Sequence, residues 1–142
     1  MILGILLFLI PVSLFAAQIE PVETKETKIP VFEKGVYPEG EYESEAIAIT
    51  ADDKTVGVAL DAKNWPTDPK ITVFVFLLES KDGGKTWVER HNAYFPGGTG
   101  KNPTMGYFDN SKDARLVKTI WAVVGGAANT AVEIVTKADV KK

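Results

Sequence analysis

Residues 71–78 read ITVFVFLL, the most strongly apolar run of the chain after its first seventeen residues. Successive side chains of a strand point to opposite faces, so one face of this run carries its four odd-numbered aliphatic residues. The opposite face carries Phe74, Phe76 and Leu78. A two-layer sandwich covers only one face of each strand, so we expect a loop, the N-terminal segment or another subunit to cover this second apolar face.

Short strands and turns continue from this run in both directions. Residues 55–61 alternate, with Val56, Val58 and Leu60 at the inward positions. Further strands are expected over residues 29–32, 45–50, 86–95, 116–124 and 130–136. Short strands separated by turn residues are typical of sandwiches and barrels. The sequence therefore predicts an all-β, antiparallel two-layer sandwich, immunoglobulin-like or jelly-roll, with about seven or eight strands.

The chain begins with an apolar leader that reads MILGILLFLIPVSLFAA. Ile2–Ile10 has the length of the apolar core of a secretory signal, and Ala16-Ala17 suits cleavage before Gln18. We expect a removable signal peptide over residues 1–17 and hence an exported protein. The alternative is an uncleaved membrane anchor, although this run is interrupted by a proline and is short for a span of about 20 residues.

The composition divides the rest of the chain into a spacer, a domain and a tail. Residues 18–28 are charged and lack an apolar period, so we expect a flexible spacer there. The sandwich domain is expected over residues 29–137 and a polar tail over residues 138–142. Within the domain, residues 96–113 are rich in glycine, asparagine and proline and predict one long loop.

The composition also excludes several kinds of chemistry. The chain has no cysteine, which excludes disulfides, thiol nucleophiles and cysteine-based metal sites. His91 is the single histidine, so a conventional transition-metal site cannot be built, and no Gly-x-Ser-x-Gly motif is present. We therefore expect no catalytic, cofactor-binding or metal-binding residues. A formal net charge of −3 argues against nucleic acid as a partner.

A single hairpin motif follows the long apolar strand. Residues 80–87 read SKDGGKTW, and they match the pattern S-x-D-x-G-x-T-W at Ser80, Asp82, Gly84, Thr86 and Trp87. This pattern resembles the Asp-box hairpin of sialidases and related β-propellers. In those proteins the hairpin recurs once per blade and lies away from the catalytic centre. One copy implies a structural hairpin in which Asp82 accepts hydrogen bonds from turn amides, and two arginines are too few for the arginine cluster of a sialidase.

The order of several segments is also familiar. Segments 37–44, 58–66, 80–87, 97–98 and 116–126 together look like those of small uncharacterised β-sandwich proteins of bacteria and their phages. The resemblance covers residues 36–136. It implies the sandwich fold and leaves the function open.

Aromatic residues beside the loops are candidate ligand-binding residues. Trp65, Tyr94 and Tyr107 lie close in sequence to asparagine, aspartate and glycine. Exposed rings of this kind stack on the apolar face of a sugar while neighbouring amides bond its hydroxyl groups. The alternative is that these rings cap the open ends of the sandwich core.

Together these observations favour binding or structural work over chemistry. The first hypothesis is a non-enzymatic exported module that binds a partner protein or a surface glycan. The second is a self-assembling subunit of an envelope, filament or virion, with Phe74, Phe76 and Leu78 in the interface. A glycan-active enzyme is a minor third hypothesis. Contact with a membrane is expected only if the leader is uncleaved.

Overall fold

The computed structural model describes residues 23–98, 103–109 and 111–140, so the predicted signal peptide lies outside the described residues. The strands are, in chain order, β1 (Glu23–Tyr37), β2 (Gly40–Glu43), β3 (Ile47–Ile49), β4 (Asp53–Leu60), β5 (Thr72–Ser80), β6 (Val88–Pro96), β7 (Thr104–Phe108), β8 (Arg115–Val124) and β9 (Ala128–Val140). The described part of the chain thus has nine strands, against the seven or eight expected. Within these ranges no helix has the length and apolarity needed to cross a bilayer.

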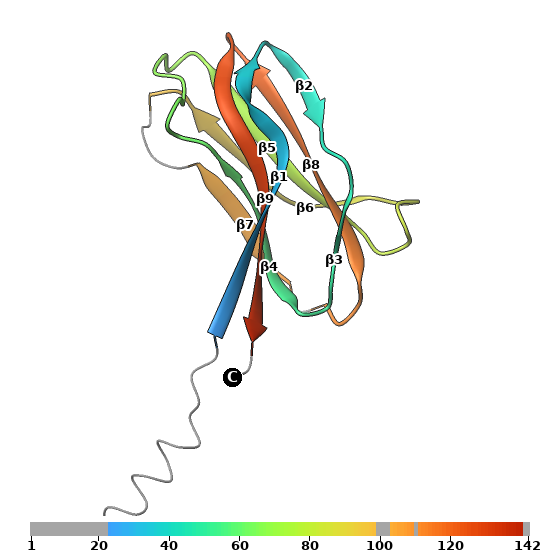
Figure 1. Ribbon diagram of the computed structural model, residues 1–142. Helices are drawn as coiled ribbons and strands as arrows, with labels where there is room; N and C mark the ends of the chain where they lie inside the picture. Colours follow the sequence, from blue (N-terminus) through green and yellow to red (C-terminus); the bar gives the residue numbers. More distant parts are fainter. Residues whose placement is uncertain (1–22, 99–102, 110, 141–142) are drawn as a thin grey trace, which may run out of the picture.

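The strands form two sheets that pack as the two layers of a sandwich (Figure 1). The four-stranded sheet has the order β1-β9-β4-β7, and the five-stranded sheet has the order β2-β8-β5-β6 with β3 also paired to β8. All of these pairings are antiparallel. The predicted fold class, an all-β antiparallel two-layer sandwich, is confirmed.

The core lies between the two sheets and follows the alternation of the sequence. All three residues placed inward on β4 are buried, and on β5 the odd-numbered residues are buried as well: Val56, Val58, Leu60, Val73, Val75 and Leu77. Each aliphatic side chain of this size contributes roughly 1.5–3 kcal/mol when it is fully buried. The apolar alternation of β4 and β5 therefore holds the layers together.

Aromatic rings fill the side of the core beneath β1 and β2. The indole of Trp121 on β8 is fully buried, and its ring stacks on Tyr42 at 4.7 Å between centroids. Phe32 and Tyr37 meet the same indole edge-on at 5.3 Å and 4.9 Å. The ring of Tyr42 is half-buried, and its hydroxyl donates to the carbonyl oxygen of Pro38 at 2.5 Å, so its polar end is satisfied.

The structure differs from the prediction in the spacer, the tail and the long loop, and it contains the strand β2, which was not predicted. The described part of the expected spacer, residues 23–28, is the first part of β1, and residues 138–140 of the expected tail belong to β9. The long loop predicted over residues 96–113 contains the strand β7.

The physical reason for the longer β1 is its pairing with β9. Partners run from Glu23 opposite Val140 to Tyr37 opposite Ala128, so the backbone of this charged segment is satisfied by a ladder. The Glu26 carboxylate also lies 3.8 Å from the ammonium groups of both Lys28 and Lys137. Figure 1 shows these ends of β1 and β9 extending beyond the body of the sandwich.

Candidate functional site

The outward side of the five-stranded sheet carries a continuous apolar surface. Register places Phe74 beside Ala122 and Tyr94, and places Phe76 beside Ile120 and Asn92. We define the outer face as the apolar side chains on this side of β5, β6 and β8, namely Phe74, Phe76, Leu78, Tyr94, Ile120, Ala122 and Val124. Cross-strand neighbours of this kind pack into one layer.

The outer face remains open in the described part of the chain. Phe74 is 37% exposed, Tyr94 67% and Val124 49%, while Phe76 and Leu78 are half-buried among their neighbours on the sheet. β1, which was expected as one possible cover, pairs in the opposite sheet. The residues predicted as an interface therefore lie together on one apolar surface. Exposed contiguous apolar surface of this kind marks an interaction site or an aggregation hazard.

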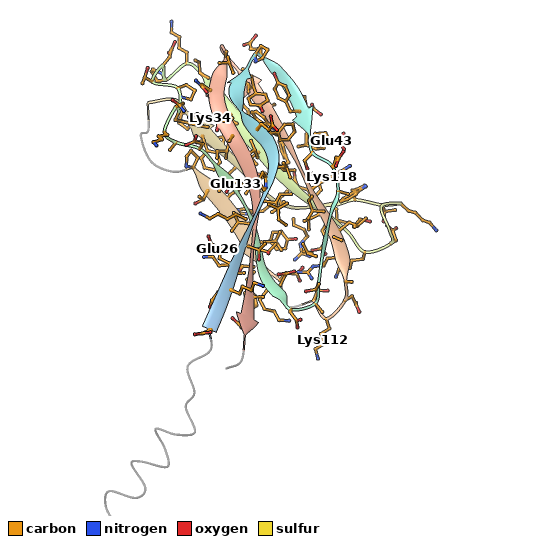
Figure 2. The ribbon with its side chains drawn as sticks, in the orientation of Figure 1. Glu26, Lys34, Glu43, Lys112, Lys118 and Glu133 are labelled. Carbon is orange, nitrogen blue, oxygen red and sulfur yellow. The ribbon has the colours of Figure 1, made fainter. Side chains whose placement is uncertain are left out.

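Charged side chains border the outer face. The Lys118 ammonium lies 2.5 Å from the Glu43 carboxylate, and Figure 2 shows the two side chains next to each other. The same ammonium lies 4.2 Å above the centre of the Trp87 ring, a cation–π contact. Glu41, exposed on β2, pairs with Ala122, and Glu89 on β6 pairs with Leu78. An apolar centre with a charged rim is the usual anatomy of a protein interface.

The hairpin over residues 80–87 is held together by its own side chains. Asp82 accepts hydrogen bonds from the Ser80 hydroxyl at 2.8 Å and the Thr86 amide at 2.9 Å, and it also accepts from the Thr86 hydroxyl. The Gly84 amide donates to the Ser80 hydroxyl at 2.9 Å, and Gly83 and Gly84 have φ of 74° and 93°. Left-handed backbone of this kind favours glycine. The turn projects from the five-stranded sheet (Figure 1).

Hydrogen bonding from Thr86, then from Ser80, lowers the pKa of Asp82 from 3.8 to about 2. We expect Asp82→Ala to lower the melting temperature at neutral pH. A carboxylate with a depressed pKa stabilises the fold above its unfolded pKa and loses that contribution as the pH falls through the folded value. The gap between the variant and the wild type should therefore close between about pH 4 and pH 2 in thermal melts.

The matched control is Asp52→Ala, since Asp52 is an exposed turn aspartate whose carboxylate makes no hydrogen bond among the described residues. Equal melting temperatures for the wild type and Asp82→Ala at pH 7 would contradict a structural role for the motif.

The three candidate ligand-binding aromatics do not form one surface. Trp65 is only 7% exposed, and its indole N–H donates to the carbonyl oxygen of Pro96 at 3.2 Å. The Tyr107 hydroxyl donates to the Glu79 carboxylate at 2.8 Å between the sheets. Tyr94 alone is widely exposed, and it belongs to the outer face. The alternative interpretation was that these rings cap the open ends of the core. The buried position of Trp65 agrees with it.

A buried ionic cluster, which the sequence analysis did not identify, lies between the sheets. Glu79 of β5 is 3% exposed, and its carboxylate lies 3.2 Å from Arg90 and 3.4 Å from Arg115. The Nε of Arg115 lies 2.8 Å from Oδ2 of Asp109, an ion pair without hydrogen-bond geometry. The Arg90 guanidinium lies 4.7 Å above the Tyr107 ring. We define the inner cluster as Glu79, Arg90, Tyr107, Asp109 and Arg115.

Backbone carbonyls complete the inner cluster. Arg115 donates to the carbonyl oxygens of Thr50 and Asp53, each at 2.9 Å, and so ties β8 to the turn before β4. Burial raises the pKa of Asp109, but hydrogen bonding, first with Glu79, and the two guanidinium charges outweigh it, so the pKa lies below 3.8. Burial and the Glu79 acceptor raise the pKa of the Tyr107 phenol well above 10. These couplings indicate a structural network.

The four-stranded sheet has a shallow groove of about 720 Å³ on its outward side. Gly57 and Gly106 lie opposite each other in its floor, and a Cβ on Gly57 would lie 2.5 Å from the carbonyl oxygen of Met105. Glu26 and Glu133 are among its lining residues, and both are labelled in Figure 2. Among residues 23–98, 103–109 and 111–140, no three acidic or histidine side chains gather to hold a metal ion.

Comparison with known proteins defines the class of fold. No protein-family model and no curated protein matches the chain. A chain in a structure of infectious bursal disease virus, Gx strain, has a TM-score of 0.50 and 8% identity, with 82% of this chain and 32% of the viral chain covered. The Yersinia pseudotuberculosis-derived mitogen has a TM-score of 0.35 and 14% identity, with 87% of this chain and 90% of the mitogen chain covered. The first likeness shows the fold alone, that of an all-β sandwich protein.

Proposed function

We propose that this chain is a non-enzymatic, exported β-sandwich module that binds another protein through the outer face. The observation that supports this function is the open apolar surface of β5, β6 and β8, of which Phe74 and Tyr94 are exposed by 37% and 67%. A soluble monomer rarely leaves so continuous an apolar surface in water. Export is proposed from the leader over residues 1–17.

The open face favours protein over glycan as the ligand. Sugar recognition by stacking needs exposed rings with polar groups that converge on the hydroxyl groups. Of the three candidate rings, Trp65 is buried and Tyr107 is bonded inside the sandwich, so Tyr94 alone is presented. The self-assembling subunit is the second candidate function, favoured by the same open face. The fold shared with a chain of a virus structure is compatible with it.

The test is retention on immobilised protein. The purified chain is coupled to a support and exposed to the exported fraction of the producing cells, supplemented with free chain. We expect the wild type to retain a defined protein and Phe76→Glu to lose it, because a charge at the centre of an apolar interface costs at least about 2 kcal/mol. The control is Thr104→Glu, which places the same charge at an exposed position of β7 on the opposite sheet.

Two outcomes would overturn this function. Equal retention by the wild type, Phe76→Glu and Thr104→Glu would mean that the binding surface lies elsewhere on the molecule. Failure of the wild type to retain any protein, including the free chain, would remove the case for a binding module.

A further inference from the structure

We propose that the partner protein contributes an extended strand, which pairs with the open edge of β6 and so continues the five-stranded sheet. The inference rests on the proposed function and deepens it by naming the kind of segment that binds. β6 is the last strand in the order β2-β8-β5-β6, so the described part of the chain pairs it on one side only. An edge strand with unpaired main-chain groups is a template for pairing with another chain.

The hydrogen bonds between β5 and β6 show which main-chain groups face the open edge. Directly opposite residues of an antiparallel pair exchange either both of their hydrogen bonds or none, and the two kinds of pair alternate. In this register Gly97 lies opposite Ile71, and its amide donates to the Ile71 carbonyl oxygen at 2.7 Å. Odd-numbered residues of β6 are therefore bonded to β5, and the N–H and C=O groups of Asn92 and Tyr94 point away from it. No main-chain hydrogen bond from another segment of the described part of the chain reaches these groups.

The open edge is bounded at both ends. At one end the register shifts, and Arg90 is the extra residue of a β-bulge. At the other end Pro96 has no N–H, and its carbonyl oxygen accepts a hydrogen bond from the indole of Trp65 at 3.2 Å. Between these ends, residues 91–95 follow one register without a bulge, a lysine or a proline. The edge thus offers a site of defined length for a short strand.

The other edges of the two sheets are protected in ways that the middle of β6 is not. β1 carries Lys25, Lys28 and Pro30 along its regular part, and its register shifts twice beyond them. β2 and β3 have four and three residues, and β7 has five. Lysine, proline, bulges and shortness are the usual protections of an edge strand against pairing. Among the described strands, β6 is therefore the best suited to receive another strand.

The side chains beside the open edge define the residues that the incoming strand needs. Tyr94 is 67% exposed, and its ring lies 6.2 Å from that of Phe74 between centroids, so the edge continues the outer face. On the other side of β6, Ala93 and Phe95 are half-buried. Aromatic and β-branched residues form favourable cross-strand pairs with such neighbours. We therefore expect an extended segment with β-branched or aromatic residues at alternate positions, held by main-chain hydrogen bonds to β6.

The first experiment measures amide hydrogen exchange of single residues by NMR. In the free chain the amides of Asn92 and Tyr94 should exchange at least ~10-fold faster than that of Ala93, which is bonded to β5. The protein eluted from the support in the retention test should slow both amides at least ~10-fold, because a paired strand protects them. Unchanged exchange in that complex would overturn the inference. Protection that appears in the free chain as its concentration rises would assign the edge to a second copy and would overturn it as well.

The second experiment removes one donor from the edge. Asn92→Pro deletes an N–H that faces away from β5, so the ladder is kept, as it is at Pro96. Binding of the eluted protein should weaken at least ~10-fold, because the incoming strand loses a hydrogen bond. The matched control is Lys28→Pro, which has the same parity as Pro30 on the edge of the opposite sheet and should bind as the wild type does. Circular dichroism checks that both variants fold, and the exchange measurement decides if Asn92→Pro does not.

The two proposals fail in different ways. If Phe76→Glu loses the retained protein while folded Asn92→Pro binds it as tightly as the wild type, the edge pairing is refuted and the proposed function stands. If the wild type retains no protein, both are refuted.

Discussion

Replacing Arg115 with methionine is expected to destabilise the fold by about 3–5 kcal/mol, the cost of breaking a buried ion pair from one side. The Arg115 side chain is fully buried and forms ion pairs with the carboxylates of both Glu79 and Asp109. Methionine keeps much of the volume but removes the positive charge. Both carboxylates would then remain between the sheets without this partner, and the carbonyl groups of Thr50 and Asp53 would lose their donors.

The loss should depend on pH in a defined direction. In the wild type the pKa of Asp109 is depressed, so its ionised form contributes stability above about pH 4 and this contribution declines as the pH falls further. Arg115→Met removes part of that contribution. The difference in unfolding free energy between the two proteins should therefore be largest near neutral pH and should narrow below about pH 4.

Urea denaturation followed by circular dichroism measures this difference. Lys137→Met is the control, because Lys137 is an exposed cation 3.8 Å from Glu26 and such surface pairs contribute at most about 1 kcal/mol. If Arg115→Met unfolds within 1 kcal/mol of the wild type at pH 7, the inner cluster does not hold the sheets together.

The inner cluster could have been predicted in part from the alternation of inward and outward positions along the strands. On β5 the odd-numbered positions 73, 75 and 77 are inward and apolar, and Glu79 is the next inward position. On β8 positions 117, 119 and 121 are inward, and Arg115 is the inward position before them. Two opposite charges at inward positions of neighbouring strands are a signal for a buried pair. The arginines were counted in the sequence only as too few for a sialidase, so this signal was missed.

The strands that were missed lack the apolar pattern on which strand prediction depends. Residues 23–28 are all exposed, and they form a strand because β9 supplies hydrogen-bond partners more than a hundred residues away in sequence. β7 is short and contains Gly106, which must be glycine because its backbone packs against Gly57. Local periodicity cannot predict strand pairing over such distances in the sequence. It does predict which residues of Ile71–Leu78 lie on each face of their strand.

Sequence position near a loop was a poor guide to the exposure of aromatic rings. Trp65 lies between asparagine and proline, yet its ring is inside, edge-on to Phe95 at 6.5 Å between centroids. The fold allows this because the Pro96 carbonyl lies within reach of the indole N–H. For Phe74 the parity of the strand gave the right side of the sheet, and its ring lies there 6.2 Å from the ring of Tyr94, measured between centroids.

Trp121→Ala is expected to destabilise the protein by about 3–5 kcal/mol, the usual cost of deleting a large buried aromatic side chain. Trp121 is fully buried and is packed by Phe32, Tyr37 and Tyr42 from two strands of different sheets. Its neighbours in sequence, Ile120 and Ala122, belong to the outer face. Collapse of the indole site therefore loosens β8 and the surface that it presents.

Trp121→Phe should cost clearly less than Trp121→Ala, because phenylalanine keeps a ring in the aromatic cluster. The indole Nε1 of Trp121 is buried and has no hydrogen-bond partner among the described residues. An unsatisfied buried donor carries a desolvation penalty of about 1–3 kcal/mol. Both variants remove this donor, but only phenylalanine keeps a ring against Tyr42. Urea denaturation followed by circular dichroism separates the two variants, with Trp87→Ala as the control for a half-buried tryptophan beside Lys118. Equal losses for Trp121→Phe and Trp121→Ala would show that a smaller ring does not preserve the packing and that the aromatic cluster depends on the indole itself.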